Sequence, residues 1–351
     1  MSDEAETTGL GLLERLERGS VICAEGYLFE FERRGYLQAG AFVPEVVLEH
    51  PELVGGLHRE FVHAGSDIVE AFTYYAHREK LRVIDREDQL ESINRTALAI
   101  AKEVASETGT LTAGNICNTN VFLAEDDTRR DVRAMFDEQI GWAADAGVDL
   151  IVGETFSYGE EALIALDAIR ETGLPSVITL SIHQEGITQE GWSPEDTCKR
   201  LEQAGADVVG LNCARGPQTM LPMIERIRAA VTCHVAALPV PYRTTDAEPT
   251  FQSLTDPGYT DFPNGRPFPT ALDPLTCNRY EISDFARRAD EIGVRYLGVC
   301  CGAGPHHIRA VAEALGRTPP ASRYSADMSK HAYYGTHERV PQEYREYAEK
   351  L

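Results

Sequence analysis

Three cysteines have the residue type and the spacing to hold a metal ion. Cys213 ends one apolar run of the sequence, and the adjacent Cys300 and Cys301 end a later run. Thiolates favour soft metals, of which zinc is the usual one in such sites. Three protein ligands leave a tetrahedral zinc with one open position, as in catalytic sites. Adjacent cysteines could instead form a strained disulfide, so the zinc hypothesis depends on the fold bringing all three sulfurs together.

Polar residues end other apolar runs in the same way. Glu25 and Glu154 follow the first and fourth runs, and Thr73 follows the second. Two carboxylates beside three thiolates would need a cation to offset their charge. The alternatives are a first-turn helix acid for Glu154 and a plain strand-end hydroxyl for Thr73. His183 follows the fifth run, and as a fourth ligand it would turn the metal site into a closed structural one.

A repeated helix-to-strand pattern positions these residues. Four segments align without gaps, each with glycine at its third position and a mainly apolar run behind it. They are HAGSDIVEAFT (63–73), DAGVDLIVGET (145–155), QAGADVVGLNC (203–213) and EIGVRYLGVCC (291–301). Glycine at that point is typical of a left-handed helix C-cap. The apolar run is typical of a parallel strand that is buried on both faces.

The rest of the chain continues the alternation. Further apolar runs lie at 20–24, 111–115, 176–182 and 234–240. Helical patterns lie at about 46–63, 86–107, 127–146, 159–172, 193–204, 217–231, 279–292 and 304–315. Eight strands alternating with eight helices predict a (β/α)8 TIM barrel. An open sheet is less favoured because no glycine-rich nucleotide turn follows the first run. In a barrel, Cys213 and the cysteine pair would meet at the C-terminal ends of next-but-one strands.

Two stretches fall outside this alternation. Residues 241–277 are rich in proline, glycine and aromatic residues, which predicts a long loop after strand seven over the C-terminal mouth. Residues 317–351 form a polar tail with several tyrosines, which we interpret as an arm that packs on the barrel or on a neighbour. We therefore predict a barrel over 1–316, a C-terminal arm that is no independent domain, and a homo-oligomer.

Composition narrows the function further. The 351 residues include 56 acids and 33 bases, for a net charge of −23 that would repel nucleic acid and anionic membranes. The N-terminus lacks the basic start and apolar run of a signal peptide, and no membrane-spanning run follows. We expect a cytoplasmic protein with small-molecule partners, no nucleic acid and no membrane. The other cysteines are interpreted as small core residues: Cys23, Cys117, Cys198, Cys233 and Cys277.

The cysteine-bearing strand ends also carry a family resemblance. GLNC (210–213) and GVCCGAGPHHIRA (298–310) resemble the homocysteine methyltransferase family. AEGYLFEFERRGYLQAGAF (24–42) resembles its betaine–homocysteine branch, and the likeness extends over nearly the whole chain. The resemblance implies a barrel enzyme that binds zinc through the three cysteines. It also implies methyl transfer from an onium donor, glycine betaine, to homocysteine, which gives methionine.

The implied chemistry accounts for the polar strand ends. A thiol must lose its proton to attack a methyl group, and coordination to zinc deprotonates it. Homocysteine sulfur would fill the open metal position. By resemblance, Glu25 and Glu154 hold the amino group of homocysteine, and Thr73 is a hydrogen-bonding neighbour.

The donor side is expected in the loops after strands one and two. Tyr27, Phe42, Tyr74 and Tyr75 could form a cage for an onium group through cation–π attraction, although aromatic residues are more often core. Tyr75 matches a donor-contacting tyrosine of the betaine enzymes. Phe42 stands where the animal enzymes have tryptophan, and Thr155 where they have tyrosine. Sulfonium donors, S-methylmethionine or dimethylsulfoniopropionate, therefore stay open as alternatives.

Two further hypotheses come from the C-terminal part of the sequence. Gly302-Ala303-Gly304 before the last helix is similar to the phosphate-binding turn of barrel lyases and isomerases. That function would leave the three cysteines without a role. In the tail, His331 and Tyr333 are candidates for contacts with a donor carboxylate.

Overall fold

A closed barrel of eight parallel strands forms the centre of the computed structural model, which describes residues 9–124 and 128–351. The strands follow the chain order around the barrel, and β8 pairs with β1. They are β1 Val21–Ala24, β2 Ile68–Glu70, β3 Leu111–Cys117, β4 Leu150–Phe156, β5 Ser176–Leu180, β6 Val208–Asn212, β7 His234–Leu238 and β8 Tyr296–Val299. Every predicted apolar run coincides with one of them, with β3 and β4 extending past the predicted ends, so the (β/α)8 prediction is confirmed.

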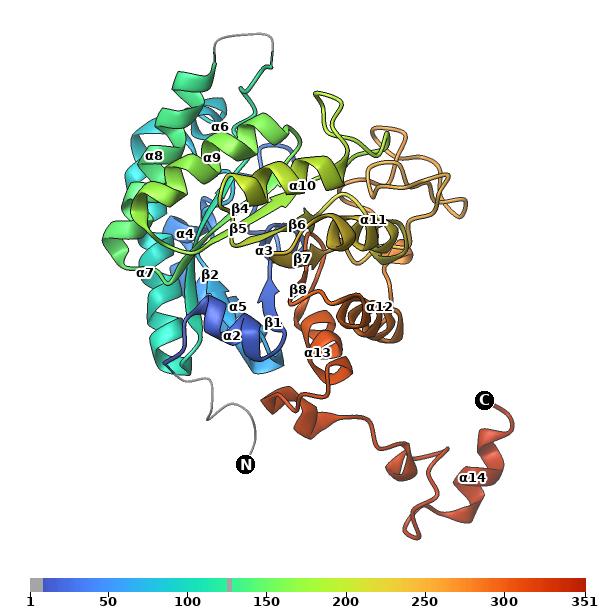
Figure 1. Ribbon diagram of the computed structural model, residues 1–351. Helices are drawn as coiled ribbons and strands as arrows, with labels where there is room; N and C mark the ends of the chain where they lie inside the picture. Colours follow the sequence, from blue (N-terminus) through green and yellow to red (C-terminus); the bar gives the residue numbers. More distant parts are fainter. Residues whose placement is uncertain (1–8, 125–127) are drawn as a thin grey trace.

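The helices surround the strands (Figure 1). The long ones are α5 Pro51–Ala64, α7 Leu90–Thr108, α8 Arg129–Ala146, α9 Gly159–Thr172, α10 Pro194–Gln203, α11 Pro217–Ala230, α12 Arg279–Ile292 and α13 Pro305–Ala314. Each matches a predicted helical pattern, although α5 and α7 extend one residue beyond theirs; residue 127, where one pattern starts, is outside the described residues, as are 1–8. Short helices were not predicted separately: α2 Leu12–Arg18, α3 Tyr27–Arg33, α4 Val46–Glu49, α6 Arg78–Val83, α14 Gln342–Ala348, and the 3-10 turns η1 Glu87–Gln89, η2 Asp273–Leu275, η3 Pro320–Tyr324 and η4 Met328–Lys330.

The four aligned segments build the same local structure. Gly65, Gly147, Gly205 and Gly293 all have positive φ, between 69° and 116°, so the predicted left-handed turns are confirmed. An aspartate two residues after the first three of these glycines binds the preceding strand. Its carboxylate accepts a backbone hydrogen bond, for example from Thr112 to Asp149 at 2.7 Å. The repeat therefore determines both where the helix ends and how the next strand aligns with the strand before it.

The inside of the barrel has two contrasting levels. Side chains alternate along a strand, so every second residue points inward. Toward the N-terminal ends these residues are apolar, and the buried Leu12 and Leu16 of α2 close that end (Figure 1). Toward the C-terminal ends the inward positions are polar and still buried: Glu25, Glu70, Asn115, Glu154 and Asn212. The chemistry is therefore expected at this upper level.

The long loop after β7 covers part of the C-terminal mouth, as predicted. Phe251 of this loop donates its backbone N–H to Ala214 O at 2.8 Å, directly after Cys213. Its ring lies 6.0 Å from that of Phe29, at the start of the chain's first βα connection. The loop thus joins the turn that carries a predicted metal ligand to the turn after β1.

The C-terminal arm leads away from the barrel (Figure 1). Its start, η3, contacts α5, and the rest is held by ring contacts within the arm, such as Tyr333 with Tyr344 at 5.4 Å. Within one chain, the segment that carries His331 and Tyr333 therefore does not cover the strand ends. Among the described residues, no helix has the length and apolar character to cross a membrane.

Candidate active site and metal centre

The fold brings the three predicted cysteines together. Their sulfurs lie within 4.8 Å of one another, and all three side chains are buried. The described cysteines are free thiols, so the cysteine pair forms no disulfide. The thiols of Cys300 and Cys301 donate hydrogen bonds to the Cys213 sulfur, which lowers the pKa of Cys213 well below its usual value. Three clustered soft ligands, one of them readily ionised, form a group that could hold a metal ion.

Strained backbone turns present these cysteines. Cys213 and Ala214 have φ angles of 55° and 51°, in the left-handed region that residues other than glycine rarely adopt. Backbone bonds hold both turns to the end of β7: Cys213 N donates to Leu238 O at 3.0 Å and Cys300 N to Pro239 O at 2.9 Å. Strain of this kind persists where the surroundings enforce it, as they commonly do at functional sites.

A clamp that was not predicted holds the turn after Cys301. Gly302 has φ of 93°, and a Cβ there would collide with the ring of Tyr242. Arg33 of α3 donates to Gly302 O at 3.1 Å and to the Tyr242 hydroxyl at 2.9 Å. Arg33 and Tyr242 therefore fix the turn that carries the cysteine pair.

The two predicted glutamates lie beside the sulfurs. Carboxylate oxygens of Glu25 and Glu154 and the Cys300 sulfur all lie within 4.8 Å of one another. Asn212 Nδ2 donates to Glu154 at 2.6 Å and lies 3.2 Å from Glu25. Thr155 joins this network, since its hydroxyl lies 2.9 Å from Asn212 Nδ2. The amide already occupies these carboxylates, which favours the three sulfurs over the mixed group as the metal ligands.

A third buried acid, Glu70, was missed from the sequence. Asn115 Nδ2 donates to Glu154 Oε1 at 2.7 Å and also to Glu70 Oε1. Burial raises the pKa of Glu70 to about 7. Burial, and then the neighbouring Glu70 charge, raises the pKa of Glu25 well above its usual value. Extending the every-second-residue pattern to the strand ends would have indicated both Glu70 and Asn115.

These groups line one small cavity at the C-terminal end of the barrel interior. The lining residues are Glu25, Tyr27, Leu28, Glu70, Ala71, Phe72, Tyr74, Asn115, Glu154, Cys300 and Cys301. No lysine, arginine or histidine is among these described lining residues. This lining favours a positively charged ligand. A cation would offset the charge of the three carboxyl groups and contact the faces of the aromatic rings.

Only two of the four residues predicted to bind the methyl donor line the cavity. Tyr27 and Tyr74 line the cavity, whereas Phe42 and Tyr75 are not among its lining residues. Lys80 Nζ lies 4.1 Å from the centroid of the Tyr75 ring, so one face of that ring already has a cation. Phe42 packs near Phe29, with ring centroids 5.9 Å apart. Phe72 is an aromatic wall residue that the sequence did not indicate.

Thr73 supports the site from behind. It is buried and lies outside the set of lining residues. Its hydroxyl donates to the backbone carbonyl of Asn115 at 2.7 Å. Thr73 thus holds the part of β3 that carries Asn115.

Two alternative hypotheses find no support at this end of the barrel. Neither metal-capable group among the described residues includes His183. Two of the three amides of the glycine turn after Cys301 are already used: Ala303 N donates to Cys300 O at 3.0 Å, and Gly304 N to His307 Nδ1 at 3.1 Å. A phosphate would therefore compete with existing bonds, which argues against a phosphate-binding lyase or isomerase.

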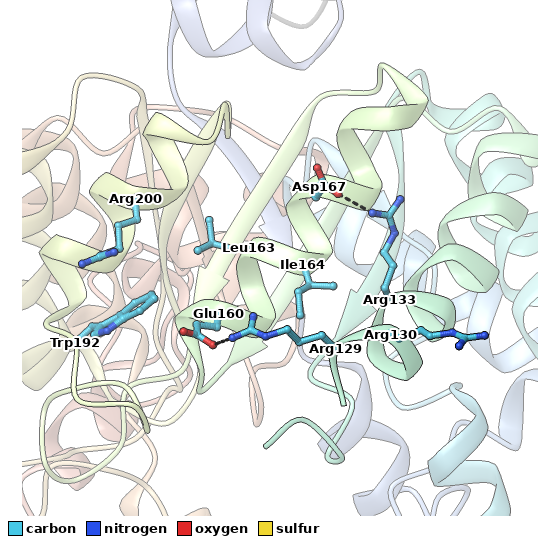
Figure 2. Close-up of a pocket in the computed structure, with 9 residues that line it drawn as sticks. All are labelled: Arg129, Arg130, Arg133, Glu160, Leu163, Ile164, Asp167, Trp192 and Arg200. Atoms are coloured by element: carbon cyan, nitrogen blue, oxygen red, sulfur yellow. Dashed lines mark hydrogen bonds and ion pairs between the residues drawn. The ribbon is translucent and has the colours of Figure 1, made fainter. Parts of the chain in front are cut away.

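A larger hollow of about 580 Å³ lies on the outer surface (Figure 2). It is lined from α8, α9 and the Trp192–Arg200 region and contains none of the predicted site residues. Two of its four arginines are already in ion pairs: Arg129 pairs with Glu160, and Arg133 pairs with Asp167 at 2.6 Å (Figure 2). The inner cavity, where the reactive groups are buried together, is the better candidate for the active site.

Comparison with known proteins shows the family of this chain. Residues 26–315 match the model of the family described as Homocysteine S-methyltransferase. Over 93% of its length, the chain is 36% identical to S-methylmethionine–homocysteine S-methyltransferase BHMT2 of Pongo abelii, covering 86% of that protein. It is 38% identical to betaine–homocysteine S-methyltransferase 1 of Danio rerio, covering 93% of this chain and 80% of that one.

A solved structure has the same fold. The homocysteine methyltransferase MmuM of Escherichia coli, in its metallated form, superposes with a TM-score of 0.65 at 17% identity, over 84% of this chain and 96% of that one. At this identity the likeness concerns the fold alone. The family match and the relatives instead rest on sequence, and they confirm the resemblance noted at the strand ends. This chain belongs to the homocysteine S-methyltransferase family and is a methyltransferase.

Proposed function

We propose that this chain transfers a methyl group from glycine betaine to the thiolate of homocysteine, with zinc bound by Cys213, Cys300 and Cys301. The observation that carries the proposal is that a carboxyl cluster, an aromatic wall and the sulfurs of Cys300 and Cys301 line one buried cavity, with the Cys213 sulfur within 4.8 Å of both. Three thiolates suit zinc and leave a position for one more sulfur. When bound, the metal lowers the pKa of the homocysteine thiol, so that a thiolate is present at neutral pH.

The acids at the cavity orient the acceptor. We assign the homocysteine ammonium to Glu25 and Glu154, whose carboxylates lie beside the Cys300 sulfur. Asn212 holds both carboxylates in place from one amide nitrogen. A positive group between them would favour their ionised forms, which burial alone opposes. Binding and charge neutralisation are thus coupled, and the substrate's sulfur is directed toward the cysteines.

The aromatic wall holds the donor. Tyr27, Phe72 and Tyr74 line the same cavity as the acids, and ring faces attract a quaternary ammonium group. The homocysteine sulfur attacks a methyl carbon, the C–S bond forms as the C–N bond breaks, and the electron pair leaves with dimethylglycine. A sulfonium donor is the second candidate, because relatives named for S-methylmethionine and for betaine are equally similar to this chain. S-methylmethionine and dimethylsulfoniopropionate are the donors to compare.

A donor series with metal analysis tests the proposal. Purified protein is assayed for bound zinc and for methionine formed from homocysteine with each of the three donors. We expect about one zinc per chain and the highest kcat/KM with glycine betaine. Full activity in metal-free protein would refute the zinc assignment. The highest kcat/KM with a sulfonium would replace the donor and leave the acceptor unchanged.

We also propose that the arm, residues 317–351, contacts a neighbouring copy in a cytoplasmic homo-oligomer and is no independent domain. Its departure from the barrel supports this (Figure 1), as do half-exposed rings such as Tyr344 and Tyr347. Light scattering of the full chain and of a chain ending at residue 316 tests it. A full-length monomer would contradict the proposal.

A further inference from the structure

The side chain of Asn115 has only one orientation that its neighbours permit. Its Nδ2 donates one hydrogen bond to Glu70 Oε1 and one to Glu154 Oε1. When these two groups are ionised they can only accept hydrogen bonds, so the nitrogen faces them and the amide is not turned around. Thr73 holds the backbone carbonyl of the same residue at 2.7 Å. Asn115 is thus fixed at both its main chain and its side chain.

This clamp leaves a buried oxygen without a donor. Asn115 Oδ1 receives no hydrogen bond from the described residues, although Asn115 is only 4% exposed. Glu25 lines the same cavity, and its Oε1 likewise receives no hydrogen bond from an N–H or O–H group of the described residues. The Cys300 sulfur lies within 4.8 Å of a Glu25 carboxylate oxygen, but Cys300 would carry no proton as a metal ligand. Buried acceptors without partners are rare in native proteins, and they indicate a missing donor.

An ammonium group has the matching number of donors. It carries three N–H groups, and three residues that line the cavity can accept from it: Asn115 and Glu25, whose Oδ1 and Oε1 atoms have no partner, and Glu154. Glu70 lies behind Asn115, where its carboxylate orients the amide and adds negative charge. A water molecule could supply two of these donors but has no charge to favour the ionised forms of the acids.

We propose that Asn115 accepts a hydrogen bond from the homocysteine ammonium through Oδ1 and that Glu70 is a positioning residue for this amide. This inference rests on the proposed acceptor and deepens it. It adds a neutral acceptor to the two carboxylates already assigned, and it makes recognition of the amino group depend on orientation as well as charge. Thr73 takes part indirectly, by fixing the Asn115 backbone.

The test compares two acceptors that differ by the amino group alone. Asn115→Leu, which keeps the size and removes the amide, is assayed with homocysteine and with 4-mercaptobutanoate. We expect kcat/KM for homocysteine to fall by about 10- to 100-fold, the range for a lost hydrogen bond to a charged group. With 4-mercaptobutanoate the change should stay within about threefold. Equal losses for both acceptors would overturn the proposal, because a structural defect affects them alike.

Calorimetry without a donor supplies a second readout. Homocysteine binding to the purified metal-loaded protein should weaken in Asn115→Leu by a similar factor, while 4-mercaptobutanoate binding stays unchanged. If the wild type binds no homocysteine, the proposed function itself fails. If the wild type binds it and Asn115→Leu binds it equally well, this inference alone fails.

The Glu70 variants separate positioning from charge. Gln at position 70 can still accept from Asn115 Nδ2, so Glu70→Gln should keep kcat/KM for homocysteine within about threefold. Glu70→Leu frees the amide and should approach the loss of Asn115→Leu. Thr179→Val is the matched control, since Thr179 is another buried polar residue of the barrel strands and does not line the cavity. If Glu70→Gln is as damaging as Glu70→Leu, the role of Glu70 is its charge and not its position.

Discussion

The lower and upper levels of the barrel interior follow opposite rules. At the lower level, Val21, Ile68, Leu111 and Leu150 are buried in a purely apolar cluster. Each such side chain stabilises the fold by about 1.5–3 kcal/mol. At the upper level, equally buried carboxyl groups have raised pKa values because burial disfavours their charge. The same strands thus build a stabilising base below and a destabilised, polar site above.

Along each strand, the inward residues change from apolar to polar over a short distance. On β4, the inward residues run Leu150, Val152 and Glu154, so the change occurs within three alternate positions. Apolar side chains suit a closed interior, whereas buried acids are retained only where a ligand or amide compensates them. The upper level should therefore respond strongly to changes in chemistry, and the lower level to changes in volume.

The largest effect is expected at the rim of the upper level. Cys300→Ala removes one of three clustered sulfurs, so we expect loss of bound metal and at least a thousandfold lower kcat/KM, with the fold retained. Metal analysis, activity and circular dichroism measure this. Cys198→Ala is the control, because Cys198 is an equally buried cysteine of α10 outside the site. Retained metal and turnover in Cys300→Ala would refute the ligand assignment.

At the lower level a deletion should lower stability and spare the chemistry. Leu150→Ala leaves a cavity among fully buried side chains and should cost about 2–5 kcal/mol in the free energy of unfolding. Denaturant unfolding measures the cost. The KM for homocysteine at a temperature well below the Tm should remain that of the wild type. A large rise in KM would show that the two levels are not separable.

The charge of the upper level predicts a pH dependence of stability. The folded pKa of Glu70 is about 7, above the unfolded value of about 4.3, so the folded state binds the proton more tightly. Its stabilising contribution is complete below about pH 4 and is lost as the pH rises to about 7. We expect the stability of substrate-free wild type, relative to Glu70→Gln, to fall by up to about 3 kcal/mol over that range. A difference independent of pH would contradict this.

The smallest effect is expected at the aromatic wall above the acids. Tyr74 lines the cavity, whereas one face of the Tyr75 ring is occupied by Lys80. We expect Tyr74→Ala to raise the donor KM by about tenfold, in line with one cation–π contact, and Tyr75→Ala to raise it less. Both should change the KM for homocysteine less than that of the donor. If a variant raises both KM values equally, its tyrosine is not part of the donor site.

Local patterns were sufficient to predict the main elements and the strand ends that carry the three cysteines. Apolar runs and C-cap glycines are set by neighbouring residues, so the eight strands, the eight long helices and the strand ends with Cys213 and Cys300-Cys301 could be predicted from the chain alone. The long loop after β7 was equally predictable, because its composition cannot continue the alternation.

The tertiary structure alone decided the partners across the barrel. The bonds of Asn115 to Glu70 and Glu154 join residues 45 and 39 positions apart, and they depend on the register of three strands. The Arg33–Tyr242 clamp and the place of Lys80 over Tyr75 likewise need the closed fold. Hydrophobic periodicity determines which residues point inward, but which inward residues touch is determined by strand stagger and loop packing, which no local pattern records.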